Sequence, residues 1–202
     1  MARQLQELRP VTRPLRARAG RGFTLIELMI VVAIVAILAV LAVVGYRKLV
    51  LSAHTSEATE MIQAIRTAQE AYHAETQIYV STAPTPVTGL YPNAAPNNMK
   101  TGWGGGISGP CLPPAASVNC WSVLPLHVDS AVMYGYATVG GAAGTPLPAL
   151  PLINGATIAV PPTTPMDWYI IGAVGDVDNN GSKTTVIGTS ITNDLFIDNE
   201  GE

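Results

Sequence analysis

The stretch RAGRGFTLIELMIVVAIVAILAV, residues 18–40, passes from arginines directly into an almost continuous apolar run. Between Phe23 and Val44, the only polar side chains are those of Thr24 and Glu27. A helix of these twenty-two residues is about 33 Å long at 1.5 Å per residue, enough to cross the hydrocarbon core of a bilayer. The sequence therefore predicts a membrane-spanning helix near the start of the chain.

The charges around this segment indicate its orientation. Residues 1–22 contain six arginines and one acid, whereas the other 180 residues contain five basic and thirteen acidic side chains. Because basic flanks stay in the cytoplasm, we expect the N-terminus inside and the chain after about Leu51 outside. The basic residues lie in a tail without an apolar pattern, which argues against nucleic-acid binding. In a secretory signal, a small residue follows a shorter apolar stretch, but here Gly22 precedes a long one.

The next segment continues as an amphipathic helix. In SEATEMIQAIRTAQEAYHAETQIY, residues 56–79, apolar side chains recur at helical spacing. No proline or glycine interrupts residues 46–81. We therefore predict one helix from Phe23 to about Tyr79, with a weak point at Gly45 because glycine is a poor helix former.

The remainder of the chain has a different composition. Fourteen of the sixteen prolines fall between Ser81 and Pro165, which excludes long helices and leaves short strands, expected in NCWSVLPL and AVMYGYATV. The runs DWYIIGAVG, KTTVIGTSI and DLFIDNE are β-rich and separated by turn-forming residues. We predict an α+β fold in which the long helix packs on a small C-terminal antiparallel β-sheet. The expected segments are a leader (1–22), an apolar helix half (23–44), an amphipathic half (45–80), a loop-rich region with short strands (81–165) and the sheet (166–202).

The segment GFTLIEL, residues 22–28, follows an arginine-rich leader and resembles the class III signal of bacterial type IV pilins and type II secretion pseudopilins. The resemblance extends through residues 56–79 and, weakly, to the terminal DNEGE. It implies that a prepilin peptidase cleaves between Gly22 and Phe23 and methylates the new amino group of Phe23. It also implies that Glu27 pairs with the Phe23 amino group of its own or a neighbouring subunit and sets the axial register of a filament.

The resemblance implies a function and a set of partners. A pilin is a structural subunit that is held in the inner membrane as a single-pass precursor and polymerises through its N-terminal helix into an extracellular filament. The implied partners are further copies of the chain, the prepilin peptidase, an assembly ATPase with its membrane platform, and an outer-membrane secretin. Adhesion, twitching motility or DNA uptake would follow from the filament. Many such pilins carry a proline where this chain has Val44 and Gly45, so a weaker helix bend is expected here.

Two alternatives explain the same N-terminal residues. A minor pilin or a type II secretion pseudopilin shares all of them, although the long Pro/Gly-rich middle fits an elaborated pilin surface better than a compact pseudopilin. An uncleaved, membrane-anchored binding module would keep its N-terminus, with Glu27 close enough to the helix end to reach the headgroups. Mature protein would then begin at Met1 or Ala2 and not at Phe23.

Cys111 and Cys120 are the only cysteines, and they lie in a proline-rich loop of the part expected outside the cytoplasm. A disulfide is the expected state there. Zinc binding is disfavoured because the one nearby histidine, His127, leaves the ligand set incomplete. No recognisable catalytic pair accompanies the other histidines, His54 and His73, and we predict that the protein is not an enzyme.

Asp176, Asp178 and Asn180 precede Gly181 with the spacing found in the first half of a calcium-binding loop. The twelfth position is Ile187 where a glutamate would be required, so the motif is incomplete. A tight turn between two strands explains the same residues and is the preferred interpretation. Calcium is the alternative, since some pseudopilins bind it in this part of the fold. We expect no other cofactor.

Overall fold

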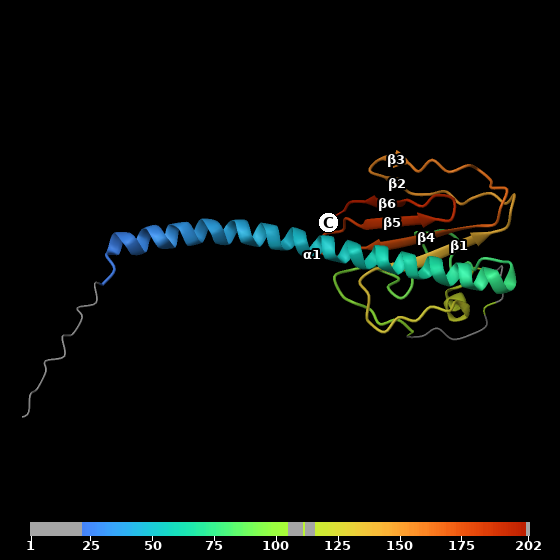
Figure 1. The fold of residues 1–202 in the computed structure, drawn as a ribbon, viewed down its shortest axis with the longest axis horizontal. Helices are drawn as coiled ribbons and strands as arrows, with labels where there is room; N and C mark the ends of the chain where they lie inside the picture. Colours follow the sequence, from blue (N-terminus) through green and yellow to red (C-terminus); the bar gives the residue numbers. More distant parts are fainter. Residues whose placement is uncertain (1–21, 105–110, 112–115, 201–202) are drawn as a thin grey trace, which may run out of the picture. The chain divides into compact units, whose positions relative to one another are not determined.

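The computed structural model describes residues 22–104, 111 and 116–200 (Figure 1). The predicted leader, except for Gly22, lies outside these described residues, and so do the last two residues of DNEGE. The chain divides into two compact units, one ending at Val43 and the other starting at Val44. The elements are α1 (Leu25–Thr76), the 3₁₀ helix η1 (Val118–Val123), β1 (Gly135–Gly141), β2 (Leu152–Ile153), β3 (Ala156–Thr157), β4 (Trp168–Gly175), β5 (Thr184–Thr189) and β6 (Leu195–Asp198).

Helix α1 confirms the predicted long N-terminal helix and continues through Gly45 without interruption. It ends at Thr76, earlier than the predicted Tyr79. The next residue, Gln77, has a φ of 59°, and its N–H donates to the carbonyl of His73 at 2.8 Å. A residue in this left-handed conformation commonly ends a helix, which explains the earlier end.

A four-stranded antiparallel sheet forms the centre of the second unit, with the strand order β1-β4-β5-β6. Strands β4, β5 and β6 confirm the three predicted C-terminal runs. The fourth strand, β1, confirms the short strand predicted in AVMYGYATV of the loop-rich region, and it pairs with β4 from Gly135 opposite Val174 to Gly141 opposite Trp168. The sheet is therefore larger than the predicted segment 166–202. Every residue of β4 is buried, and such a strand needs a hydrogen-bonded neighbour on each side.

A short hairpin, β2–β3, adjoins the sheet and was not predicted. Its turn residues, Asn154 and Gly155, both have positive φ values, 50° and 75°, which Asn-Gly hairpin turns require. The N–H of Asn154 donates to the carboxylate of Asp198 at 2.6 Å, and its side-chain amide donates to the carbonyl of Ile197 at 3.3 Å. The hairpin is thus held against β6.

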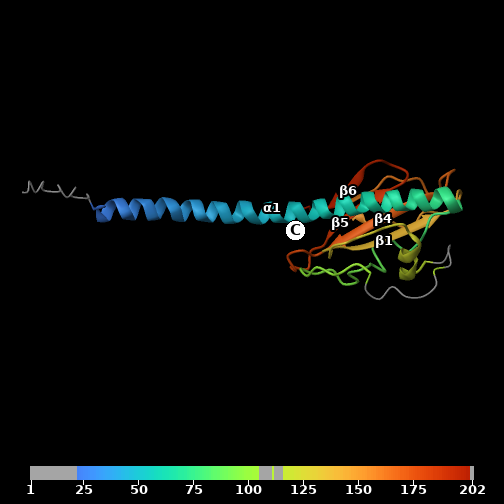
Figure 2. The same cartoon turned by 60° about the horizontal axis from the view of Figure 1, so that its bottom comes forward.

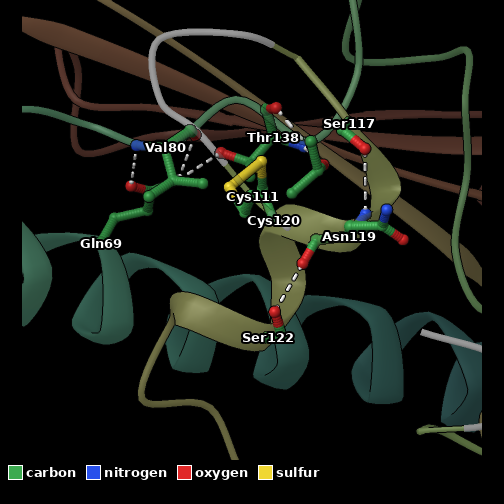
Figure 3. The surroundings of a disulfide bond; sticks show 9 residues. Gln69, Val80, Cys111, Ser117, Asn119, Cys120, Ser122 and Thr138 are labelled. Carbon is green, nitrogen blue, oxygen red and sulfur yellow. Dashed lines mark hydrogen bonds between the residues drawn. A yellow bond between two sulfur atoms is a disulfide. The ribbon is translucent and has the colours of Figure 1, made fainter. Parts of the chain in front are cut away.

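The strand predicted in NCWSVLPL is wrong, because Val118–Val123 forms η1. Ser117 caps this helix by accepting a hydrogen bond from the N–H of Asn119 at 3.3 Å, and the Ser122 hydroxyl donates to the Asn119 carbonyl at 2.7 Å (Figure 3). Local bonds of this kind compete with pairing in a sheet. The apolar residues of this run reach the core from the helical turn, where Trp121 is buried.

Within the second unit, α1 packs along one face of the sheet (Figure 2). Its buried face includes Ala58, Ile62 and Ile65, each fully inaccessible to solvent. These side chains share a core with aromatic and aliphatic residues of η1, of the sheet and of the segment just before β1: Trp121, Tyr134, Tyr136, Ile171 and Val186. The periodicity of residues 56–79 therefore marks the sheet-facing side of the helix.

Candidate processing and assembly site

The predicted cleavage site lies immediately before α1. Gly22 and Phe23 are both exposed, and 86% of the surface of Phe23 is accessible. A Cβ atom added at Gly22 would meet no described atom within 4 Å. The peptide bond between Gly22 and Phe23 is therefore sterically open to an approaching protein in the part of the chain that the structure describes.

Thr24 and Glu27 form a reciprocal cap at the first turn of α1. The N–H and the hydroxyl of Thr24 donate to Oε2 of Glu27 at 2.8 and 2.7 Å, and the N–H of Glu27 donates to the Thr24 hydroxyl at 3.3 Å. This arrangement is a capping box, which satisfies backbone donors that a helix start leaves unpaired. The sequence interpretation used Glu27 alone and missed Thr24, although the Thr-x-x-Glu spacing is a signal for this cap.

The cap places the carboxylate beside the residue that processing would expose. Both Thr24 donors bind Oε2 of Glu27, and among the described residues no hydrogen bond engages Oε1. The Glu27 carboxylate accepts a hydrogen bond from the backbone N–H of Thr24, and Phe23 is the residue just before Thr24. After cleavage at Gly22, the backbone nitrogen of Phe23 would carry a positive charge close to the carboxylate.

No described residue covers the apolar half of α1. Its large side chains are more than half exposed throughout, for example Leu25 at 76% and Val44 at 66%. The helix is apolar on all sides here, with a mean hydropathy of 3.3 over its most apolar eighteen-residue window, and it is long enough to cross a membrane. A helix with this surface requires lipid or other apolar helices around it.

The predicted disulfide is present, with Cys111 and Cys120 joined at 2.08 Å (Figure 3). Cys120 lies in η1 and is fully buried, whereas Cys111 is half-buried. Figure 3 shows the bond near Gln69 of α1 and near Val80 and Thr138, two residues to which the Gln69 amide donates at 2.8 Å. The disulfide thus belongs to the packing of the second unit.

The three calcium candidates lie in the turn between β4 and β5. Asp176 accepts hydrogen bonds from the N–H groups of Asn180 and Gly181 at 3.1 and 3.2 Å. Asp178 also accepts from the N–H of Asn180, at 3.2 Å, and Asn180 in turn accepts from the N–H of Ser182 at 2.6 Å. The side-chain oxygens thus stabilise the turn itself, which favours the turn interpretation. Calcium binding stays a prediction.

Residues 18–43 match the family model of the prokaryotic N-terminal methylation motif. No curated protein and no solved structure matches the chain. The matched segment includes the cleavage pair Gly22 and Phe23, the capping box of Thr24 and Glu27, and most of the apolar half of α1.

Proposed function

Because this chain is type IV pilin-like in both its methylation motif and its α+β layout, we propose that it is a structural subunit of a type IV pilus. A prepilin peptidase would cleave between Gly22 and Phe23 and methylate the amino group of Phe23. The mature chain would then polymerise through its N-terminal helix into an extracellular filament. The observation that carries this proposal is the exposed, almost wholly apolar half of α1, most of which lies within the matched motif.

The energetics of the apolar half explain why assembly needs a motor. In the bilayer, lipid tails surround this helix as favourably as apolar side chains would, so transfer to a helical bundle gains little hydrophobic free energy. Once outside the membrane, the same side chains would face water unless copies of the helix cover them. The filament would thus be stable after extraction, whereas extraction itself requires an assembly ATPase and platform, with a secretin as the outer-membrane exit.

Glu27 would supply specificity in this assembly. A carboxylate buried in an apolar bundle is costly unless a positive charge pairs with it. The Thr24 donors satisfy Oε2, and Oε1 is the atom available for the methylated amino group of Phe23 on the same or a neighbouring subunit. Only one axial offset between neighbouring helices brings the carboxylate and the amino group together, so this pair would set the axial register of the filament.

Intact mass and N-terminal sequencing of protein from the membrane and from sheared extracellular material test this function. Abundant sheared protein beginning with N-methyl-Phe23 is the expected result. Processed protein confined to the membrane would instead indicate a minor pilin or a pseudopilin. Protein that keeps Met1 or Ala2 would overturn the proposal in favour of an anchored binding module.

Gly22→Val provides the matched test of processing. A branched side chain at the cleavage position should block the peptidase, so uncut precursor should accumulate in the membrane. Gly45→Val, a similar change inside α1, should leave processing intact, because an added Cβ at Gly45 meets no atom within 4 Å. Normal cleavage of Gly22→Val would contradict the assignment of this site.

A further inference from the structure

A cleft of about 730 Å³ lies at the start of the second unit. One wall is the face of α1 from Tyr46 to His54, and the opposite wall includes Lys100, Met133 and Asp178. Ligand-binding clefts usually have volumes of about 300 to 1,000 Å³, so this one can hold a small polar group with part of an attached chain. Of the site residues predicted from the sequence, Asp178 alone lines this cleft.

The lining of this cleft combines basic and apolar groups. Arg47, His54 and Lys100 face it, against the single carboxylate of Asp178. Lys100 Nζ lies 3.2 Å from a Glu57 oxygen, and His54 Nδ1 lies 3.9 Å from the same oxygen. An ammonium has three N–H donors, so Glu57 leaves donors of Lys100 available. No carboxylate among the described residues pairs with Arg47 within 4.0 Å.

The position of Arg47 along the chain relates the cleft to the membrane. Arg47 follows Val44, the last residue of the apolar half, by three residues, a rise of about 5 Å along a helix. The headgroup layer on each side of a bilayer is about 5 to 8 Å thick. Tyr46, which also lines the cleft, is of a residue type enriched at this level of the membrane.

We propose that this cleft binds the headgroup of a membrane phospholipid. The Arg47 guanidinium would hold the phosphate, since its fork of N–H groups matches phosphate oxygens. The rest of the headgroup would extend into the cleft past Val50 and Leu51 toward His54 and Lys100, while the acyl chains would stay in the bilayer. The proposal requires α1 to span a bilayer and does not depend on cleavage or polymerisation.

Native mass spectrometry of the full chain in detergent, with phosphatidylglycerol added, measures this binding. Diacylglycerol, which has the same chains but no phosphate, serves as the lipid control. Arg47→Gln combined with Lys100→Gln should weaken phosphatidylglycerol retention by roughly tenfold or more, because hydrogen bonds between charged groups are lost. Lys48→Gln combined with Lys183→Gln removes the same charge outside the cleft and should retain lipid as the wild type does.

Three results would overturn the proposal. Equal retention of phosphatidylglycerol and diacylglycerol would exclude phosphate recognition. Equal losses in the two double variants would show a general effect of charge and no site. Displacement of the lipid by inorganic phosphate at the same concentration would assign the cleft to a free anion. Since lipid retention is measured on uncleaved chain, failure here would leave the proposed pilus function untouched.

Discussion

Gln69 is the buried polar residue that connects α1 to the loop following it, and Gln69→Ala is our principal stability prediction. Its amide group donates to the carbonyl of Val80 and to the hydroxyl of Thr138, both at 2.8 Å, while its Oε1 accepts from the N–H of Val80 at 3.0 Å. All three residues are fully buried. Removing the amide would strand both backbone groups of Val80 away from water.

The expected loss follows from those two groups. Each buried backbone group without a partner costs about 1 to 3 kcal/mol, so Gln69→Ala should lower the free energy of unfolding by roughly 2 to 6 kcal/mol. A loss of this size is a large fraction of the 5 to 15 kcal/mol that typically stabilises a domain. For a domain of this length, the thermal midpoint should fall by roughly 5 to 20 °C.

Thermal unfolding of the full chain in detergent, followed by near-ultraviolet circular dichroism, measures this change. Hydrogen exchange at the Val80 amide supplies a local readout, which should be slow in the wild type and fast in the variant. Gln63→Ala is the control, since Gln63 lies exposed on the same helix and should change the midpoint little. A loss below about 1 kcal/mol in Gln69→Ala would refute the reasoning, because it would mean that other groups satisfy Val80.

Gln69→Glu tests the same hydrogen bonds with almost unchanged shape. An ionised carboxylate can accept from the N–H of Val80 but cannot donate to its carbonyl. The folded state would therefore favour the protonated acid and raise its pKa above the unfolded value of about 4.3. The variant should be most stable below that pH and lose stability as the pH rises toward the folded pKa.

Other predictions concern the helix start, an ion pair and a packed glycine. Glu27→Leu should insert into the membrane and be processed, yet enter filaments only when wild-type subunits supply the carboxylate, as measured in sheared fractions. Hydrogen bonds from the backbone N–H of Ala143 and from His73 lower the pKa of Asp167. The stabilising contribution of Asp167 should therefore be present above its unfolded pKa of about 3.9 and be lost as the pH falls through the lower folded pKa. The thermal midpoints of the wild type and of Asp167→Asn, measured between pH 2 and 7, should converge at the acidic end. Gly188→Ala should cost about 1 to 3 kcal/mol in thermal or chemical unfolding, because the new Cβ would lie 2.8 Å from a methyl group of a buried isoleucine in α1.

Each of these predictions has a control within the chain. Abundant filaments made of Glu27→Leu alone would remove the register role. A midpoint difference between wild type and Asp167→Asn that persists unchanged at pH 2 would show that the charge of Asp167 is not its source. Gly102→Ala should be neutral, since an added Cβ there meets nothing within 4 Å, whereas a neutral Gly188→Ala would show that Ile62 can move aside.

The long helix could be predicted because its signals are local. Local patterns of this kind can be read from a single sequence. They are the apolar run, the absence of proline and glycine over residues 46–81, and the β-rich C-terminal runs. The cleavage pair and the role of Glu27 were predicted from the resemblance of residues 22–28 to a class III signal. The Thr24 cap was equally local and could have been found from the spacing of Thr24 and Glu27.

The missed features depend on contacts between distant parts of the chain. A strand was predicted in AVMYGYATV, where β1 lies, but its pairing with the buried β4 was missed, because no residue near Gly135 in sequence indicates that partner. The run around Trp121 has strand-like composition, but the Ser117 cap turns it into a 3₁₀ helix. The hydrogen bonds of Gln69 likewise require the folded positions of Val80 and Thr138, so the sequence could only assign Gln69 to a helix.

The two units differ in where their stabilising contacts come from, and this difference supports assembly as the function. In the second unit, α1 buries its apolar face against its own sheet, and even the guanidinium of Arg66 finds carbonyl acceptors at Thr189 and Asp194, at 3.1 and 3.4 Å. The apolar half before Val44 has no such contacts within the described chain, although its side chains are the most apolar of all. Surroundings outside the chain must therefore cover it, first lipid and then, on our proposal, identical helices. In that half, the cap leaves one oxygen of Glu27 without a described hydrogen bond, which is what the proposed pairing with the Phe23 amino group of the same or a neighbouring subunit requires.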